Sequence, residues 1–178
     1  MAESAKWLVD PAHSSLDFSI KHMALAKVKG SFHTFEGSIE GDPKDLTSGK
    51  VRFSANIESI DTRNQERDHH LRTADFFDAE KYPKMTFESS QIERKEEGTY
   101  EVSGELAIHG FSRTEVFQVT YEGEAKDQDG KWRAGFSGAG AIDRRNYGIG
   151  WNQEMEAGRF MIGNTVNIYI EIEAVKTA

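Results

Sequence analysis

Apolar residues alternate with polar residues through most of this chain, and no other feature constrains the fold as strongly. The clearest example is the segment 166–174, in which every second residue is apolar: Val166, Ile168, Ile170, Ile172 and Ala174. Successive side chains of a β-strand point to opposite faces, so a period of two gives a strand one apolar and one polar face. The sequence therefore predicts an all-β protein with a shared apolar interior.

The same period predicts strands at residues 6–10, 15–22, 29–41, 49–59, 84–93, 100–108, 114–123, 131–141 and 165–175. Several are separated by turn residues, such as Gly and Pro at 41–43 and Asp and Gly at 127–130. A sheet that is wetted on one face only must pack on a second sheet or close on itself, and closure also removes exposed edges. A barrel that closes around more space than its side chains fill would be a container.

One segment departs from the alternation. Residues 64–79 are rich in charge and lack Gly and Pro, and Asn64 is a candidate N-cap, so a helix is expected there, with a short second turn after Asp75. Three residues give this segment an apolar side: Leu71, Phe76 and Phe77. Such a segment suits a lid across one end of a barrel. Residues 142–164 are expected to be mostly irregular, and a loop of that length is usually functional.

The length of the chain limits the number of domains, and its charge limits the classes of partner that it can bind. The chain of 178 residues is expected to form one domain, residues 1–178. Its formal net charge of -8 argues against nucleic acid or an anionic bilayer as the main partner, because both attract Lys and Arg. No apolar stretch reaches the roughly 20 residues that span a bilayer, so stable membrane insertion is not expected. The first six residues, MAESAK, do not resemble a secretory signal, which predicts a cytoplasmic location.

Few residues in the chain suggest catalysis. The absence of cysteine excludes disulfides, thiolate metal sites and Cys nucleophiles. The sequence contains no nucleophile elbow, phosphate-binding loop, dinucleotide fingerprint or HExxH motif, so no cofactor is expected. The remaining candidates are the histidines, of which His22 shares the inward parity of Phe18 and Ile20, and His109 ends a strand. With His13 and His70 they would either converge on a transition metal or hydrogen-bond at strand ends, and we predict no metal.

Two arginines are candidates for a polar ligand group. Arg67 lies in the expected helix, and Arg144 precedes an aromatic, Gly-containing loop. An arginine at a barrel mouth can donate two hydrogen bonds to a phosphate or a carboxylate. The alternative is that these arginines pair with acidic neighbours such as Glu66 and Asp68.

Short blocks in order along nearly the whole chain, from about residue 7 to residue 175, resemble the YceI-like polyisoprenoid-binding proteins. They are DPAHS (10–14), FSIKH (18–22), KGSF (29–32), FEG (35–37), SIDT (59–62), RDHHL (67–71), DFFD (75–78), YPKMTFES (82–89), GELAIHG (104–110) and RRNYGI (144–149). The resemblance implies an extended lipocalin-like, eight-stranded antiparallel β-barrel with a helical insertion near one end. It also implies an isoprenoid-type lipid, a polyprenyl chain or a prenylated quinone, in an elongated apolar pore.

Three functions are compatible with these features. The first, which the resemblance favours, is a non-enzymatic protein that carries or sequesters such a lipid. The second is a histidine- or metal-dependent enzyme acting on a lipid in the same pore, and the third is a filled barrel that binds a protein. The expected partner is a small-molecule lipid, and a homodimer stays open.

The residues expected to contact the ligand come from the inward parity of the strands, from the helical segment and from the loop after residue 142. They are Phe18, Ile20, His22, Phe35, Ile39, Phe53, Ile57, Arg67, His70, Leu71, Phe76, Phe77, Phe87, Leu106, Ile108, His109, Phe136, Arg144, Tyr147, Trp151, Ile168 and Ile170.

Overall fold

The computed structural model describes residues 5–155 and 160–177. Within them lie eleven strands: β1 (Lys6–Val9), β2 (Ser15–His22), β3 (Ala26–Phe32), β4 (Phe35–Asp42), β5 (Asp45–Asn56), β6 (Ile60–Asp61), β7 (Lys84–Glu96), β8 (Thr99–Ile108), β9 (Phe111–Lys126), β10 (Trp132–Asp143) and β11 (Ile162–Lys176). The helix α1 spans Gln65–Arg72, and three short 3-10 helices are η1 (Pro11–His13), η2 (Ile57–Ser59) and η3 (Arg144–Tyr147). Residues 1–4, which contribute to the expectation about a secretory signal, lie outside the described residues.

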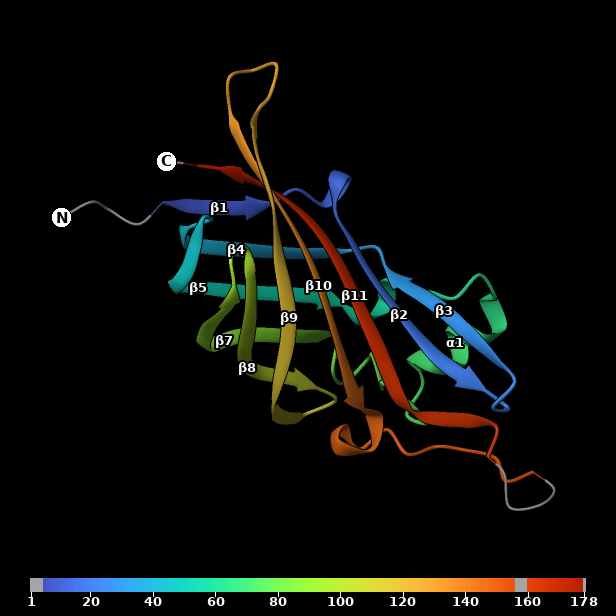
Figure 1. The fold of residues 1–178 in the computed structure, drawn as a ribbon. Coiled ribbons are helices and arrows are strands. Elements are labelled where there is room, and N and C mark those ends of the chain that lie inside the picture. Colours follow the sequence, from blue (N-terminus) through green and yellow to red (C-terminus); the bar gives the residue numbers. More distant parts are fainter. Residues whose placement is uncertain (1–4, 156–159, 178) are drawn as a thin grey trace.

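Eight of these strands close into an antiparallel barrel in the order β1-β4-β5-β7-β8-β9-β10-β11 (Figure 1). The ring closes at β1, where Trp7 lies opposite Ile39 of β4 on one side and Lys176 of β11 on the other. Closure gives every strand of the ring two partners, so the alternating pattern has one wetted face and one enclosed face. The all-β, eight-stranded barrel expected from the sequence is confirmed.

The barrel wall continues beyond the ring on one side. β11 is long enough to pair with β1 near its C-terminal end and with β2 along residues Ile162 to Glu171. β2 in turn pairs with β3, and β3 with the short β6. These strands extend the wall at the end where α1 lies (Figure 1). No helix among the described residues is long and apolar enough to cross a membrane.

The strand expected over residues 29–41 is two strands, β3 and β4, separated by His33 and Thr34. The reason is topological, because β3 pairs with β2 in the extension whereas β4 pairs with β1 and β5 in the ring. The strand expected over 49–59 ends at Asn56, and η2 follows. Alternation within a segment does not reveal such a change of partner.

The helix begins as expected and ends early. The Asn64 side chain accepts a hydrogen bond from the Arg67 main-chain N–H at 3.0 Å, which confirms the N-cap. The helix stops at Arg72 rather than continuing to residue 79, because the backbone of Thr73 is extended; the Thr73 hydroxyl donates to the carbonyl of His70 at 2.6 Å. The residues that follow form hydrogen-bonded turns, among them the bond from the Phe77 N–H to the Leu71 carbonyl.

Candidate functional site: an apolar cavity within the barrel

The interior of the barrel encloses a cavity of about 550 Å³. Side chains from all eleven strands and from α1 border it, and most of them are aliphatic or aromatic. The volume lies within the range of about 300–1,000 Å³ that is typical of ligand pockets. Its mainly apolar lining is suited to a hydrophobic ligand.

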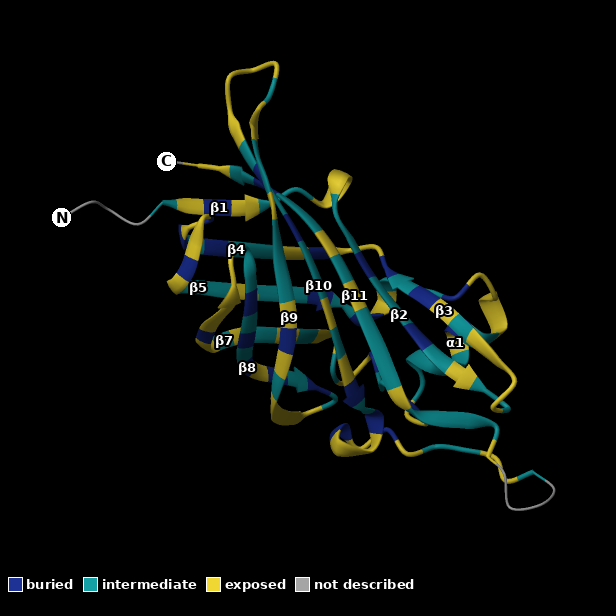
Figure 2. Ribbon diagram, viewed as in Figure 1, coloured by how far each residue is buried: buried dark blue, intermediate teal, exposed yellow. Residues whose placement is uncertain are grey.

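β11 shows how the alternation produces the cavity. Its inward residues from Ile162 to Ile172 border the open space and stay half-buried, whereas Ala174, two residues further on the same face, has no exposed surface. Figure 2 shows the half-buried stretch along β11. Ten residues of strand correspond to about 33 Å. The lining therefore extends over most of the length of the barrel wall.

The cavity is closed at the end where β1 joins the ring. Leu46, Val102 and Phe136 border the space there. Behind them Trp7 and Tyr100 are at most 3% exposed, belong to the same buried cluster and do not border the cavity. The Tyr100 hydroxyl donates to the Lys44 carbonyl at 3.0 Å, which fixes the ring across this end. This end is a solid apolar floor.

Glycines let the inward phenylalanines lie against the wall. An added Cβ at Gly140 would meet the ring of Phe117 at 2.5 Å, and one at Gly30 would meet the ring of Phe18 at 2.3 Å. Both rings therefore lie across the backbone of a neighbouring strand instead of projecting further into the cavity. This arrangement leaves the centre of the barrel open.

The opposite end, near α1, carries a cluster of polar and aromatic groups of the lining. The ring of His70 packs edge-on against Trp151, with centroids 4.8 Å apart, and against Phe76 at 5.0 Å. Its Nε2 lies 2.8 Å from a carboxylate oxygen of Asp75. Thr62 and Asn64 also border the cavity here. The two ends thus differ in character, because Leu46, Val102 and Phe136 make the floor mainly apolar whereas the α1 end is polar and aromatic.

Arg67 is held at this end by Thr62. Its Nε donates to the Thr62 hydroxyl at 2.7 Å and its Nη2 to the Thr62 carbonyl at 2.6 Å. Thr62 is itself fixed by the buried Asp68, whose carboxylate accepts the Thr62 main-chain N–H at 2.8 Å. Asp68 therefore acts on Arg67 through Thr62, rather than as the direct ion-pair partner considered in the sequence analysis.

Arg144 is held by main-chain carbonyls. Its Nε donates to Gly163 at 2.8 Å, and its Nη1 donates to Ile149 at 2.8 Å and to Trp151 at 2.9 Å. The residue is only 4% exposed and borders the cavity. Burial lowers the pKa of this guanidinium from its usual value, because desolvation disfavours the charged form. The side chain ties the loop after η3 to the start of β11.

Most residues expected to contact a ligand border the cavity: Phe18, Ile20, His22, Ile39, Phe53, Arg67, His70, Leu71, Phe76, Phe77, Phe87, Leu106, Ile108, Phe136, Arg144, Tyr147, Trp151, Ile168 and Ile170. Their part in ligand binding stays a prediction.

Three expected residues lie elsewhere. Phe35 is buried in a packed cluster, stacked on Phe53 with centroids 5.5 Å apart. Ile57 follows the end of β5 and lies in η2, where it is 1% exposed. His109 has a positive φ of 56° in the β8–β9 turn, and its Nδ1 lies 2.9 Å from the Tyr147 carbonyl. A residue at a tight turn leaves the inward parity of its strand.

Other lining residues are not among the expected ligand contacts. Many share the inward parity of their strands and could have been found by it: Leu16, Val28, Val51, Met85, Val102, Phe117, Val166 and Ile172. Ile149 and Met161, in the loop before β11, carry no such signal.

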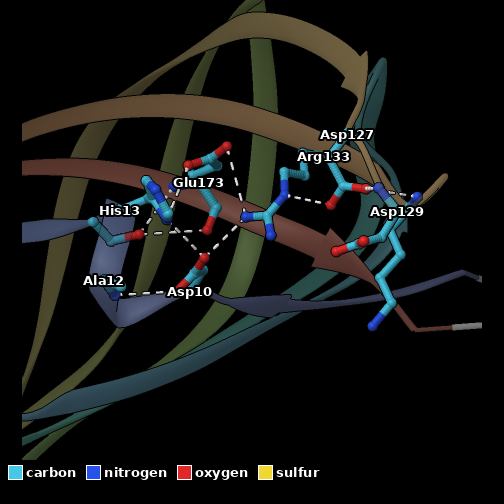
Figure 3. A network of polar contacts seen from close by, with 9 residues as sticks. Asp10, Ala12, His13, Asp127, Asp129, Arg133 and Glu173 are labelled. Carbon is cyan, nitrogen blue, oxygen red and sulfur yellow. Dashed lines mark hydrogen bonds and ion pairs between the residues drawn. The ribbon is translucent and has the colours of Figure 1, made fainter.

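A polar cluster lies away from the cavity lining, at the junction of β1 and β2 (Figure 3). Asp10, His13 and Glu173 offer ligand atoms within 4.8 Å of one another, and within the described residues no other three His or acidic side chains do so. Arg133 lies among them, with its Nη1 2.9 Å from Asp10 and 3.7 Å from Glu173. Its guanidinium lies where a cation between these carboxylates would lie, and pairs with both of them. The histidines expected as an alternative metal site do not converge in the described part of the chain.

Comparison with known proteins places this barrel among relatives. The model of the YceI-like domain matches residues 7–174. A UPF0312 protein of Staphylococcus aureus strain N315 is 39% identical over 165 residues, covering 92% of this chain and 94% of the relative. The crystal structure of a YceI protein from Campylobacter jejuni has a TM-score of 0.76 at 33% identity and covers 89% of this chain and 90% of its own.

Two further structures share the fold at lower identity. Burkholderia cenocepacia BcnA gives a TM-score of 0.81 at 24% identity, covering 93% of this chain and 98% of its own. A polyisoprenoid binding domain from Saccharophagus degradans gives 0.73 at 16% identity, covering 96% and 98%. The fold and its cavity define a lipocalin-like β-barrel with a mainly apolar interior. Within that class, this chain belongs to the YceI-like family.

Proposed function

We propose that this protein binds an isoprenoid-type lipid, a polyprenyl chain or a prenylated quinone, in the barrel cavity and carries or sequesters it without chemical change. The observation that carries the proposal is the long cavity of about 550 Å³ with an almost wholly apolar lining and a closed floor. The domain from Saccharophagus degradans, whose name describes it as polyisoprenoid binding, has the same fold and supports this choice of ligand.

The energetics of such a ligand are favourable. Burial of apolar groups contributes about 0.8 kcal/mol per CH₂, so a five-carbon isoprene unit contributes roughly 3–4 kcal/mol before the costs of binding. Non-covalent affinity saturates near about -18 to -21 kcal/mol, which corresponds to five or six such units. Selectivity for tail length must therefore come from the length of the cavity.

The enzyme alternative receives no support from a particular group of side chains. His22 and His70 border the cavity, but His70 is engaged by Asp75 and by two aromatic rings. We therefore keep the non-enzymatic reading as the proposal. The cytoplasmic location stays a prediction from the sequence, and a homodimer stays open.

A matched pair of variants on β9 tests whether the cavity is the binding site. Val119 borders the cavity, whereas Val116, on the same strand, is 46% exposed on the outer surface. Val119→Trp should place an indole ring in the open space, where it occupies volume that the ligand would otherwise fill. We expect the affinity for a 20-carbon prenyl alcohol to fall by about tenfold or more, because less of the ligand is then buried. Tryptophan at position 116 should leave the affinity unchanged.

The measurement is a titration of the purified protein with the prenyl alcohol, followed by intrinsic fluorescence, with circular dichroism to show that both variants fold. Equal affinity of Val119→Trp and Val116→Trp would place the ligand outside the barrel and contradict the proposal. Loss of binding in both variants would do the same.

A further inference from the structure

Arg144 has an unused hydrogen-bond donor in a buried position. Three main-chain carbonyls accept from its Nε and Nη1, but its Nη2 is buried and has no acceptor. A buried donor without a partner is costly, and a charged one more so. Since the residue borders the cavity, a ligand atom is the natural candidate for the missing acceptor.

Arg144 also has no ion-pair partner among the described residues. Asp143, its neighbour in the chain, pairs with Arg145 through a contact of 2.6 Å. The carbonyls offer only partial negative charge, and a buried cation is stabilised best by a full countercharge. An anionic acceptor therefore suits this position better than a neutral one.

The surroundings indicate which part of a lipid would occupy this place. Trp151, whose carbonyl accepts from Arg144, packs against His70 of α1. Arg67, one helical turn before His70, also borders the cavity and also forms no ion pair among the described residues. The opposite floor at Leu46 and Val102 is apolar. A tail would thus lie toward the floor and a polar head near α1.

We propose that the α1 end of the cavity binds an anionic oxygen head group, a phosphate or a carboxylate, with Arg144 as its principal donor and Arg67 as the second cation. This inference rests on the proposed lipid-binding function and names the class of head group. Because Nη2 is covered by protein atoms, the head group reaches it by displacing some of them. The planar guanidinium then donates to the anion in the geometry that favours phosphate and carboxylate.

Three ligands that share one 20-carbon prenyl tail test this inference: geranylgeranyl phosphate, geranylgeranoic acid and geranylgeraniol. For the unmodified protein we expect the anionic ligands to bind about tenfold or more tightly than the alcohol, the factor that one charge-assisted hydrogen bond supplies. Arg144→Gln should remove this preference, so that the three ligands bind this variant with equal affinity. Arg145→Gln, at the neighbouring exposed residue that pairs with Asp143, is the control and should retain the preference.

Isothermal titration calorimetry measures the affinities, and the ³¹P resonance of the bound phosphate reports contact with a guanidinium. A preference for the phosphate alone, or for the acid alone, supports the inference and identifies the anion. Equal binding of all three ligands, or a preference that persists in Arg144→Gln, overturns it and leaves the lipid-binding proposal intact. If no ligand binds, both proposals fail. Should Arg144→Gln not fold, the comparison of the three ligands on the unmodified protein decides the question, with Arg144→Lys as the charge-retaining variant.

Discussion

The Nη1 of Arg133 on β10 donates a hydrogen bond of 2.9 Å to the carboxylate of Asp10, across 123 positions of sequence. Asp10 caps η1 at the point where β1 ends, and the Arg133 Nε binds Asp127 at 2.8 Å (Figure 3). Arg133 thus ties β10 to the junction of β1 and β2, next to the place where the barrel closes. The hydrogen bonds from Arg133 first, and then from His13, lower the pKa of Asp10 from 3.8 to about 2.

Arg133→Gln should destabilise the protein in a pH-dependent manner. The folded-state pKa of Asp10 lies below its unfolded value, so its contribution is fully present above about pH 4 and is lost as the pH falls toward 2. Allowing for solvent screening, we expect a loss of about 1 kcal/mol in the free energy of unfolding at pH 7, shrinking toward pH 2. Urea unfolding at both pH values measures it. The control is Arg52→Gln, which removes an exposed pair with Glu88. An equal loss at both pH values for Arg133→Gln would contradict the conclusion that Arg133 lowers the pKa of Asp10.

Leu71→Asp should weaken lipid retention more than it weakens the fold. Leu71 lies on α1, borders the cavity and is half-buried, so a carboxylate there would be placed against the ligand without a partner. We expect about tenfold faster release of a bound prenyl lipid and a small change in melting temperature. Leu25→Asp, the same substitution at a site that is 78% exposed, should change neither. A collapse of stability with unchanged release from the folded fraction would show that Leu71 is core rather than lid, and Phe77→Asp would repeat the test.

Leu46→Ala should shift the preferred tail length upward. Leu46 is part of the floor, so its truncation deepens the cavity. The expected cost in the free energy of unfolding is about 2–5 kcal/mol. Ile92→Ala is a matched control, because Ile92 belongs to the same buried cluster without bordering the cavity. The ratio of affinities for a 20-carbon and a longer prenyl alcohol is the measurement, and a ratio that moves equally in both variants would argue against a floor that limits tail length.

Protein made without a polyhistidine tag should carry no stoichiometric transition metal. In the cluster of Asp10, His13 and Glu173, the guanidinium of Arg133 already pairs with both carboxylates and would repel a metal cation. Elemental analysis tests the expectation. Near-stoichiometric zinc, iron or nickel that is lost in His13→Ala or His22→Ala would overturn it and raise the enzyme alternative above the carrier.

The alternation predicted the strands and the enclosed face because side-chain direction in a strand is a local property. On β11 it correctly assigned Ile168 and Ile170 to the interior. It could not tell open space from solid packing. Phe35 and Ile39 share the inward parity of β4, yet only Ile39 borders the cavity, because the pairing of β4 with β1 and β5 sets their positions along the barrel. That pairing joins distant segments and leaves no local signal.

The polar end of the cavity was predicted less completely. Sequence reasoning named Arg144 but left open whether it faces a ligand or pairs with an acidic neighbour. Its partners prove to be main-chain carbonyls, one of them at Gly163, 19 positions away. Main-chain acceptors are common to every residue, so nothing in the sequence marks them.

The most direct test of the central claim is mass spectrometry of a solvent extract from purified, untagged protein. We expect a prenyl lipid in near-stoichiometric amount in extracts of the unmodified protein and of Val116→Trp, and its loss in Val119→Trp. A folded protein whose extract contains no such lipid, and which takes up none when prenyl lipids are supplied, would contradict it.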